Sequence, residues 1–137
     1  MKSLLSIVLV VATAFALSAC SNYSKRNYTE VPLSEGEEIV PFNEFCYFET
    51  EPQGAAFKIV KKKTVVAGNV YGSPDALLPK LEEKVKTQGG NSIANFNASQ
   101  RFGFWPWRAI RPIVSGDAIQ IMNAHGKSCA ELGGHTR

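Results

Sequence analysis

The cysteines and histidines are the residues of this sequence best suited to metal or redox chemistry. The chain has cysteines at positions 20, 46 and 129 and two histidines. Two thiols and two imidazoles are ligand types that hold zinc in tetrahedral sites. One such set can be written here: Cys46, His125, Cys129 and His135. Four positions separate His125 from Cys129, which is not the spacing of a known zinc motif, so a metal site is allowed but carries no signature.

Motifs that identify common classes of enzyme are absent from the sequence. It contains no Gly-x-Ser-x-Gly elbow, no glycine-rich phosphate loop and no His-Glu-x-x-His pair. The isolated carboxylates Asp117, Glu82 and Glu83 fit a turn and a solvent-facing helix surface better than a catalytic pair. We therefore expect a protein that is not an enzyme and that needs no cofactor.

Aromatic and basic residues gather in the segment 101–111, which is the best candidate for an interaction site. Trp and Arg are enriched in binding hot spots and at membrane–water boundaries. Pro106 stiffens the segment and so reduces the entropy lost on binding. The alternative is that some of the rings close one end of a small core. The residues predicted to bind a partner are Phe102, Phe104, Trp105, Trp107, Arg108 and Arg111.

The first residues of the chain have the layout of a secretory signal. Lys2 precedes an apolar stretch from Leu4 to Leu17. This stretch is shorter than the roughly 20 residues that a membrane-spanning helix needs. A cleaved signal peptide is therefore favoured over an uncleaved membrane anchor.

The residues that end this stretch, Leu17-Ser18-Ala19-Cys20, resemble the lipobox of bacterial lipoproteins at every position. The resemblance implies that the Cys20 thiol receives a diacylglyceryl group, that a peptidase cuts before it, and that the new amine is acylated. Several acyl chains on one residue give stable anchoring where a single chain gives only marginal binding. Ser21 follows instead of the Asp that resembles an inner-membrane retention signal. We expect an outer-membrane lipid anchor in a bacterial cell envelope, with the protein facing the periplasm.

Lipidation of Cys20 leaves Cys46 and Cys129 as the only thiols of the mature chain. Because the exported compartment is oxidising, these two are predicted to form a disulfide. The bond would join the segment before the main domain to the segment after it. Thiolates that hold a metal with His125 and His135, or two unreacted thiols, are the alternatives.

Charge is divided unevenly along the chain. Residues 21–56 hold seven Asp and Glu against two Lys and Arg, whereas residues from Phe57 onward hold twelve Lys and Arg against five acids. A basic surface can attract nucleic acid, but an exported protein rarely meets it, so no nucleic-acid partner is expected. Either the acidic segment lies against its own basic domain, or the two regions meet different partners.

Hydrophobic periodicity predicts three strands and one helix in the main domain. Strands are expected at 57–72, 91–99 and 110–122 because these segments are rich in β-branched residues. Leu77, Leu78, Leu81 and Val85 share one helical face, and Pro79 requires the helix to begin near 75–78. Gly89 and Gly90 end that helix.

The order of these elements predicts a small α+β fold. A strand, a helix and a second strand form a right-handed crossover that makes the two strands parallel, and the third strand returns antiparallel. The chain then divides into a signal peptide (1–19), a lipidated Cys with a flexible acidic tether and a short aromatic strand (20–56), a βαββ domain with one covering helix (57–123) and a C-terminal tail (124–137).

The segment 57–122 resembles the YbjQ-like superfamily, which includes the RcsF-type outer-membrane stress-sensor lipoproteins. The resemblance lies in Gly68–Gly72, in the junction Gly89–Ile93 and in Gly116–Ile119. Small residues there, including Ala94 and Ala118, would let the helix approach the sheet. The resemblance implies a non-catalytic binding or stress-sensing module with an envelope protein as partner. Some family members carry a heavy-metal-binding label, so a periplasmic metal-binding lipoprotein is the alternative.

Overall fold

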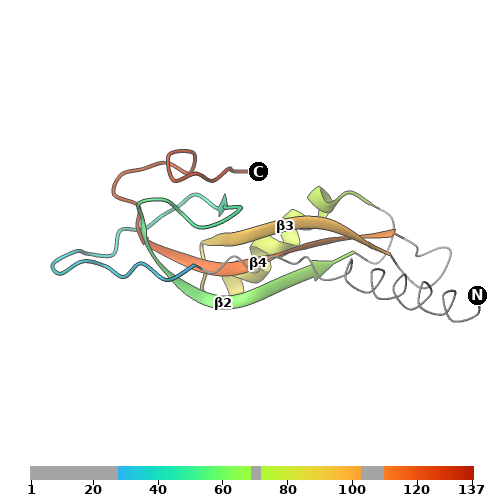
Figure 1. Cartoon of the computed structure of the whole chain (residues 1–137), viewed down its shortest axis with the longest axis horizontal. Helices are drawn as coiled ribbons and strands as arrows, with labels where there is room; N and C mark the ends of the chain where they lie inside the picture. The colour runs from blue at the N-terminus through green and yellow to red at the C-terminus, as the bar shows by residue number, and fades with distance from the viewer. Residues whose placement is uncertain (1–27, 69–71, 103–109) are drawn as a thin grey trace, which may run out of the picture.

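The computed structural model describes residues 28–68, 72–102 and 110–137. These residues form a four-stranded mixed sheet with one α-helix, which is the α+β class predicted from the sequence (Figure 1). The elements are β1 (Cys46–Tyr47), β2 (Ala56–Ala67), a 3₁₀ turn η1 (Pro74–Leu77), α2 (Leu78–Thr87), β3 (Ser92–Phe102) and β4 (Ile110–Asn123).

The strand order across the sheet is β1-β3-β4-β2. The central strand β4 pairs antiparallel with both β3 and β2, while the short strand β1 pairs parallel with β3. Strands β2 and β3 therefore run in the same direction, but β4 lies between them. The aromatic run that contains Cys46 and Tyr47 adds the fourth strand, and this parallel pair makes the sheet mixed.

The helical segment begins with a capped turn and ends at glycine. Ser73 Oγ accepts a hydrogen bond from the Asp75 N–H at 3.2 Å, and Pro79 lies in the first turn of α2, where its missing N–H costs nothing. Beyond the helix, Gly89 has φ +88°, a conformation that glycine adopts without steric cost. These positions agree with the helix start and stop predicted from the sequence.

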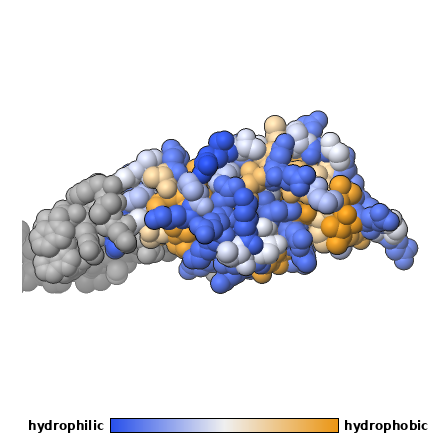
Figure 2. Space-filling view, turned by 180° about the vertical axis from the view of Figure 1, so that it is seen from behind, coloured by the Kyte–Doolittle hydropathy of each residue, from blue (hydrophilic) through white to orange (hydrophobic). Residues whose placement is uncertain are grey.

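Helix α2 covers one face of the sheet; it lies behind the strands in Figure 1. Leu81 and Val85 of the helix are fully buried, and hydrophilic residues dominate the view from that side (Figure 2). The Ala118 methyl group lies in the core beneath the helix, as its small size predicted. The core of this face consists of Tyr47, Leu77, Leu81, Val85, Ile93, Val114 and Ala118.

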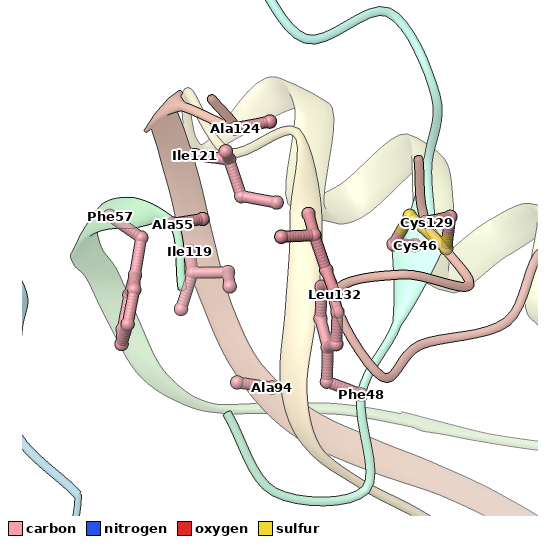
Figure 3. Close-up of a cluster of buried hydrophobic side chains, with 10 residues drawn as sticks. All are labelled: Cys46, Phe48, Ala55, Phe57, Ala94, Ile119, Ile121, Ala124, Cys129 and Leu132. Carbon is pink, nitrogen blue, oxygen red and sulfur yellow. A yellow bond between two sulfur atoms is a disulfide. The ribbon is translucent and has the colours of Figure 1, made fainter. Parts of the chain in front are cut away.

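A second core lies on the opposite face of the sheet, where loops and the C-terminal segment cover it (Figure 3). Ala94 belongs to this second core, so the expectation that it makes room for the helix is wrong. Its neighbour Ile93 points to the helix face because successive residues of a strand alternate between faces. The second core consists of Cys46, Phe48, Ala55, Phe57, Ala94, Ile119, Ile121, Ala124, Cys129 and Leu132.

The segments on either side of the sheet domain also pack against it. Residues 28–44, expected to be a flexible tether, contact the sheet: Val31 forms an antiparallel bridge with Phe57. In the C-terminal segment, expected to be a tail, Leu132 is fully buried, and His135 bridges to Tyr47. The two edges of the sheet are therefore each extended by one bridge, Val31 beside β2 and His135 beside β1.

Candidate functional site

A disulfide joins Cys46 in β1 to Cys129 in the C-terminal segment. The two Cα atoms lie 5.9 Å apart, within the usual range for this bond, and 83 positions separate the residues. Both cysteines are buried in the second core. The predicted pairing is confirmed, and it fixes the C-terminal segment to the edge of the sheet (Figure 3).

Glu44 lies beside this disulfide. Its Oε2 accepts a hydrogen bond from the Cys129 N–H at 3.1 Å. Among the described residues, the ligand atoms of Glu44, Cys46 and Cys129 lie within 4.8 Å of one another, and neither histidine belongs to this group. The arrangement does not support the predicted alternative of two thiolates and two imidazoles, because the sulfur atoms are bonded to each other.

The two histidines have separate contacts. His125 Nδ1 lies 3.0 Å from Glu37 Oε1, so it joins the C-terminal segment to the acidic segment. The His135 ring stacks on Tyr47 with ring centroids 5.7 Å apart, and its backbone N–H and C=O both bond to Tyr47. Each imidazole thus helps to hold a peripheral segment in place.

The lipidation and partner-binding residues predicted from the sequence lie mostly outside the described part of the chain. Cys20 falls in the undescribed residues 1–27, and the segment 103–109 contains Phe104, Trp105, Trp107 and Arg108. Phe102 and Arg111 are at the facing ends of β3 and β4, where Arg101 pairs with Arg111 in the strand register. The segment 103–109, which connects these two strands in the sequence, lies outside the described residues.

Asp117 is a buried carboxylate at the centre of a hydrogen-bond network. It lies in the middle of β4, inside the segment predicted as a strand, and is only 9% exposed, so the turn suggested as the reason for an isolated carboxylate is wrong. Its Oδ1 accepts the Lys63 N–H at 2.8 Å, and its Oδ2 accepts the Tyr28 hydroxyl at 2.8 Å and the Asn95 Nδ2–H at 3.1 Å. A buried carboxylate needs such partners, because an unpaired one is costly.

Two bulges explain why a carboxylate is needed there. The register of β2 shifts between Lys61 and Thr64, and that of β3 shifts between Ala94 and Asn97. Lys63 has φ +57° and Asn95 φ +49°, values that turn their polar groups away from the ladder. Asp117 bonds both. Asn adopts a positive φ more readily than most residues, so the Asn at position 95 could have indicated a bulge from the sequence. The Lys at position 63 gave no such indication.

Tyr47 carries a buried hydroxyl that has no hydrogen-bond partner among the described residues. Burial raises the pKa of Tyr47 to about 12; the Glu82 charge adds to this rise and the Arg137 charge opposes it. The ring packs edge-on against Phe45 and Phe96, at 5.2 and 5.1 Å between centroids.

Two of the hollows on the described surface are wide open to solvent. One, of about 570 Å³, lies along the helix beside Arg137, and there Lys86 Nζ pairs with Glu82 Oε1 at 3.1 Å. The other, of about 460 Å³, lies between residues 28–30 and β2. Neither combines a nucleophile, a base and an orienting group in the way that hydrolytic sites do.

Comparison of the chain with protein-family models, with curated proteins and with solved structures finds no match. The resemblances to the YbjQ-like superfamily and to the lipobox thus depend only on the short sequence motifs quoted above for them. A search of the described helices for one of sufficient length and hydrophobicity to cross a bilayer also finds none.

Proposed function

We propose that the protein is a lipid-anchored component of a bacterial cell envelope that acts as a non-catalytic binding or stress-sensing module. The observation that carries the proposal is the sequence Leu17-Ser18-Ala19-Cys20 at the end of an apolar stretch. Only a thiol at that position can form the thioether to diacylglyceryl. The acyl chains would hold the protein on the membrane, and Ser21 favours delivery to the outer membrane.

The fold supports an exported protein. The Cys46–Cys129 disulfide links two segments of the folded chain, and disulfides persist mainly in oxidising compartments. In this proposal residues 1–19 are a cleaved signal peptide, and 57–123 form a βαββ unit of the YbjQ-like type. RcsF-type sensors have two disulfides whereas this chain has one, so the resemblance supports the class of protein and not an identical signalling role.

A partner would bind through the aromatic segment. Residues 103–109 connect β3 to β4 in the sequence, and they include Trp105 and Trp107. Trp side chains contribute strongly to binding because they bury a large area at low entropic cost. The proposed partner is an envelope protein.

The test of the anchor is Cys20→Ala. The variant should lack lipid and remain uncut by the lipoprotein peptidase, because the thiol that receives the diacylglyceryl group is gone. Mass spectrometry of the mature protein and membrane flotation measure both effects. A variant that still matures to a product beginning at residue 20 and floats with membranes would refute the proposal.

The test of the partner surface is photo-cross-linking in intact cells, followed by identification of the captured protein. Trp105→Ala with Trp107→Ala should reduce the cross-linked product severalfold while the unfolding midpoint stays near that of the wild type. A loss of about 3 kcal/mol or more in stability for either single change would instead show a core residue.

A metal-binding lipoprotein is the second candidate, and the proximity of Glu44 to the two sulfur atoms is the observation that favours it. In a reduced protein the two thiolates and the carboxylate would offer three ligands. Metal analysis of protein purified without a tag, with and without prior reduction, decides this candidate. If the protein contains no bound metal either with or without prior reduction, this candidate is excluded.

A further inference from the structure

The hollow beside β2 lies where the chain leaves the domain toward the N-terminus. The segment 28–30 forms one wall, and β2 residues 59–62 form the other. The hydroxyl of Tyr28 is held by Asp117, and the Ile59 N–H donates to Glu30 Oε1 at 2.8 Å, so the wall is fixed to the strand. The hollow is lined by Tyr28, Thr29, Glu30, Ile59, Val60, Lys61 and Lys62.

Its charge is positive. Lys61 and Lys62 are both exposed, and no ion pair in the described part of the chain involves either of them. Glu30 is the one acidic residue of the lining, and one of its oxygens is bonded to the backbone. Lys58 and Lys63 lie exposed on either side along β2. Two lysines and one glutamate therefore line a hollow that is large enough for a phosphate-bearing headgroup, and two further exposed lysines lie near it along β2.

The position of this hollow relative to Cys20 is constrained by chain length. Tyr28 lies eight positions after Cys20, with seven residues between them, so an extended chain spans at most about 28 Å from one to the other. This connecting chain contains Lys25 and Arg26 and no acidic residue. If Cys20 carries the proposed lipid, the lysine edge is held near the bilayer surface, and basic residues close to a membrane are attracted to anionic lipids.

We propose that the β2 hollow binds the anionic phospholipid headgroups of the membrane in which the protein is anchored. This inference rests on the proposed function, because the anchor brings the headgroups within reach. Lys61 and Lys62 would donate hydrogen bonds to phosphate oxygens. The β2 edge would then face the bilayer, and the β1 edge with its His135 bridge would face away from it.

The test uses the lipidated full-length protein in vesicles of phosphatidylcholine alone or with about one third phosphatidylglycerol. A membrane-impermeant amine-acetylating reagent is added, and lysine modification is followed by mass spectrometry. Lys61 and Lys62 should react at least about threefold more slowly in the anionic vesicles, and high salt should remove the difference by screening. Lys80 and Lys127, which are exposed on the helix and on the C-terminal segment, should react equally in both.

A variant pair tests the same residues directly. Cross-linking to a phosphatidylglycerol analogue with a photoreactive headgroup should fall at least about threefold in Lys61→Gln with Lys62→Gln, because both phosphate donors are lost. It should not change in Lys80→Gln with Lys127→Gln, which removes the same charge elsewhere.

Three outcomes would overturn the proposal. Equal labelling in both vesicles, or equal cross-linking in both variants, shows that the hollow does not contact headgroups. Protection by inorganic phosphate in phosphatidylcholine vesicles shows a site for a free anion instead. If the protein enters neither kind of vesicle and Cys20 is unmodified, the anchor fails and the headgroup proposal fails with it, whereas equal labelling of an anchored protein leaves the anchor intact.

Discussion

At the scale of single residues, Asp117 and Tyr47 are two buried polar groups of the sheet that differ in their hydrogen bonding. Asp117 accepts three hydrogen bonds and so connects two bulges and the segment that begins at Tyr28. Tyr47 has a buried hydroxyl with no partner among the described residues. The Asp117 carboxylate holds the irregular part of the sheet together, whereas the Tyr47 hydroxyl costs free energy in the folded state.

Tyr47→Phe should therefore leave stability at pH 7 unchanged or raise it by about 1 kcal/mol, because it removes a hydroxyl that pays desolvation without a bond. Denaturant unfolding followed by circular dichroism measures the change. A loss of more than about 1 kcal/mol would show that the hydroxyl has a partner in solution.

The same residue predicts a dependence on high pH. The pKa of Tyr47 is raised from 10.0 to about 12 in the folded protein, so its protonated form is favoured by folding. This contribution is fully present below pH 10 and is lost as the pH rises toward 12, by an amount on the order of 2 kcal/mol. The free energy of unfolding is compared between wild type and Tyr47→Phe at each pH. The contributions of the lysines and of the other tyrosines, which titrate in the same range, cancel in the difference. Parallel stability curves across this range would contradict the prediction.

At the scale of elements, the junction between α2 and β3 is packed closely against the neighbouring strand β4. The side chain of Asn91 imitates a strand neighbour: its Oδ1 accepts the Ile121 N–H at 2.8 Å and its Nδ2 donates to the Ile121 C=O at 3.1 Å. A Cβ on Gly90 would meet Val85 Cγ1 at 2.8 Å and the Ile119 carbonyl oxygen at 2.9 Å. The junction therefore needs glycine for space.

Gly90→Ala should destabilise the protein by about 1–3 kcal/mol, because backbone of the central strand must move to admit the methyl group. Gly72→Ala is the matched control. A Cβ there would meet only Pro112 Cγ at an ordinary 3.9 Å, so its effect should be within about 0.5 kcal/mol of zero. Equal effects of the two changes would refute the close approach.

At the scale of the whole molecule, the disulfide decides how the second core is closed. The C-terminal segment supplies Ala124, Cys129 and Leu132 to that core, and a local turn holds the segment together. In this turn Glu131 Oε2 accepts the Ser128 N–H at 2.6 Å, and the Ser128 bonds lower the pKa of Glu131. The C-terminal segment thus covers the face of the sheet opposite α2, and the Cys46–Cys129 disulfide ties this segment to β1.

Cys46→Ala with Cys129→Ala should lower the free energy of unfolding by about 4 kcal/mol, since the bond closes a loop of 83 positions in the unfolded chain. Unfolding of oxidised wild type, reduced wild type and the variant should be compared by denaturant titration. Reduced wild type serves as the control because it breaks the same bond without deleting side chains. A change below about 1 kcal/mol would show that the segment is held by packing alone.

The sequence by itself determined the elements whose signals are local. The face of Leu81 and Val85, the position of Pro79 and the glycine after the helix fixed α2, and β-branched runs fixed the long strands. The pairing of Cys46 with Cys129 also followed, because lipidation of Cys20 would leave only those two thiols. The lipid anchor and the partner segment stay predictions.

Only the tertiary structure decided the arrangements that depend on contacts between distant residues. The insertion of β4 between β2 and β3, the side of the sheet that Ala94 faces, and the packing of residues 28–44 and of Leu132 arise from long-range pairing, which local periodicity does not encode. Asp117 is the clearest case. The predicted strand 110–122 contains it, but nothing near it in the sequence indicates its partners: bulges in two other strands and the hydroxyl of Tyr28 surround it, and these come together only when the sheet forms.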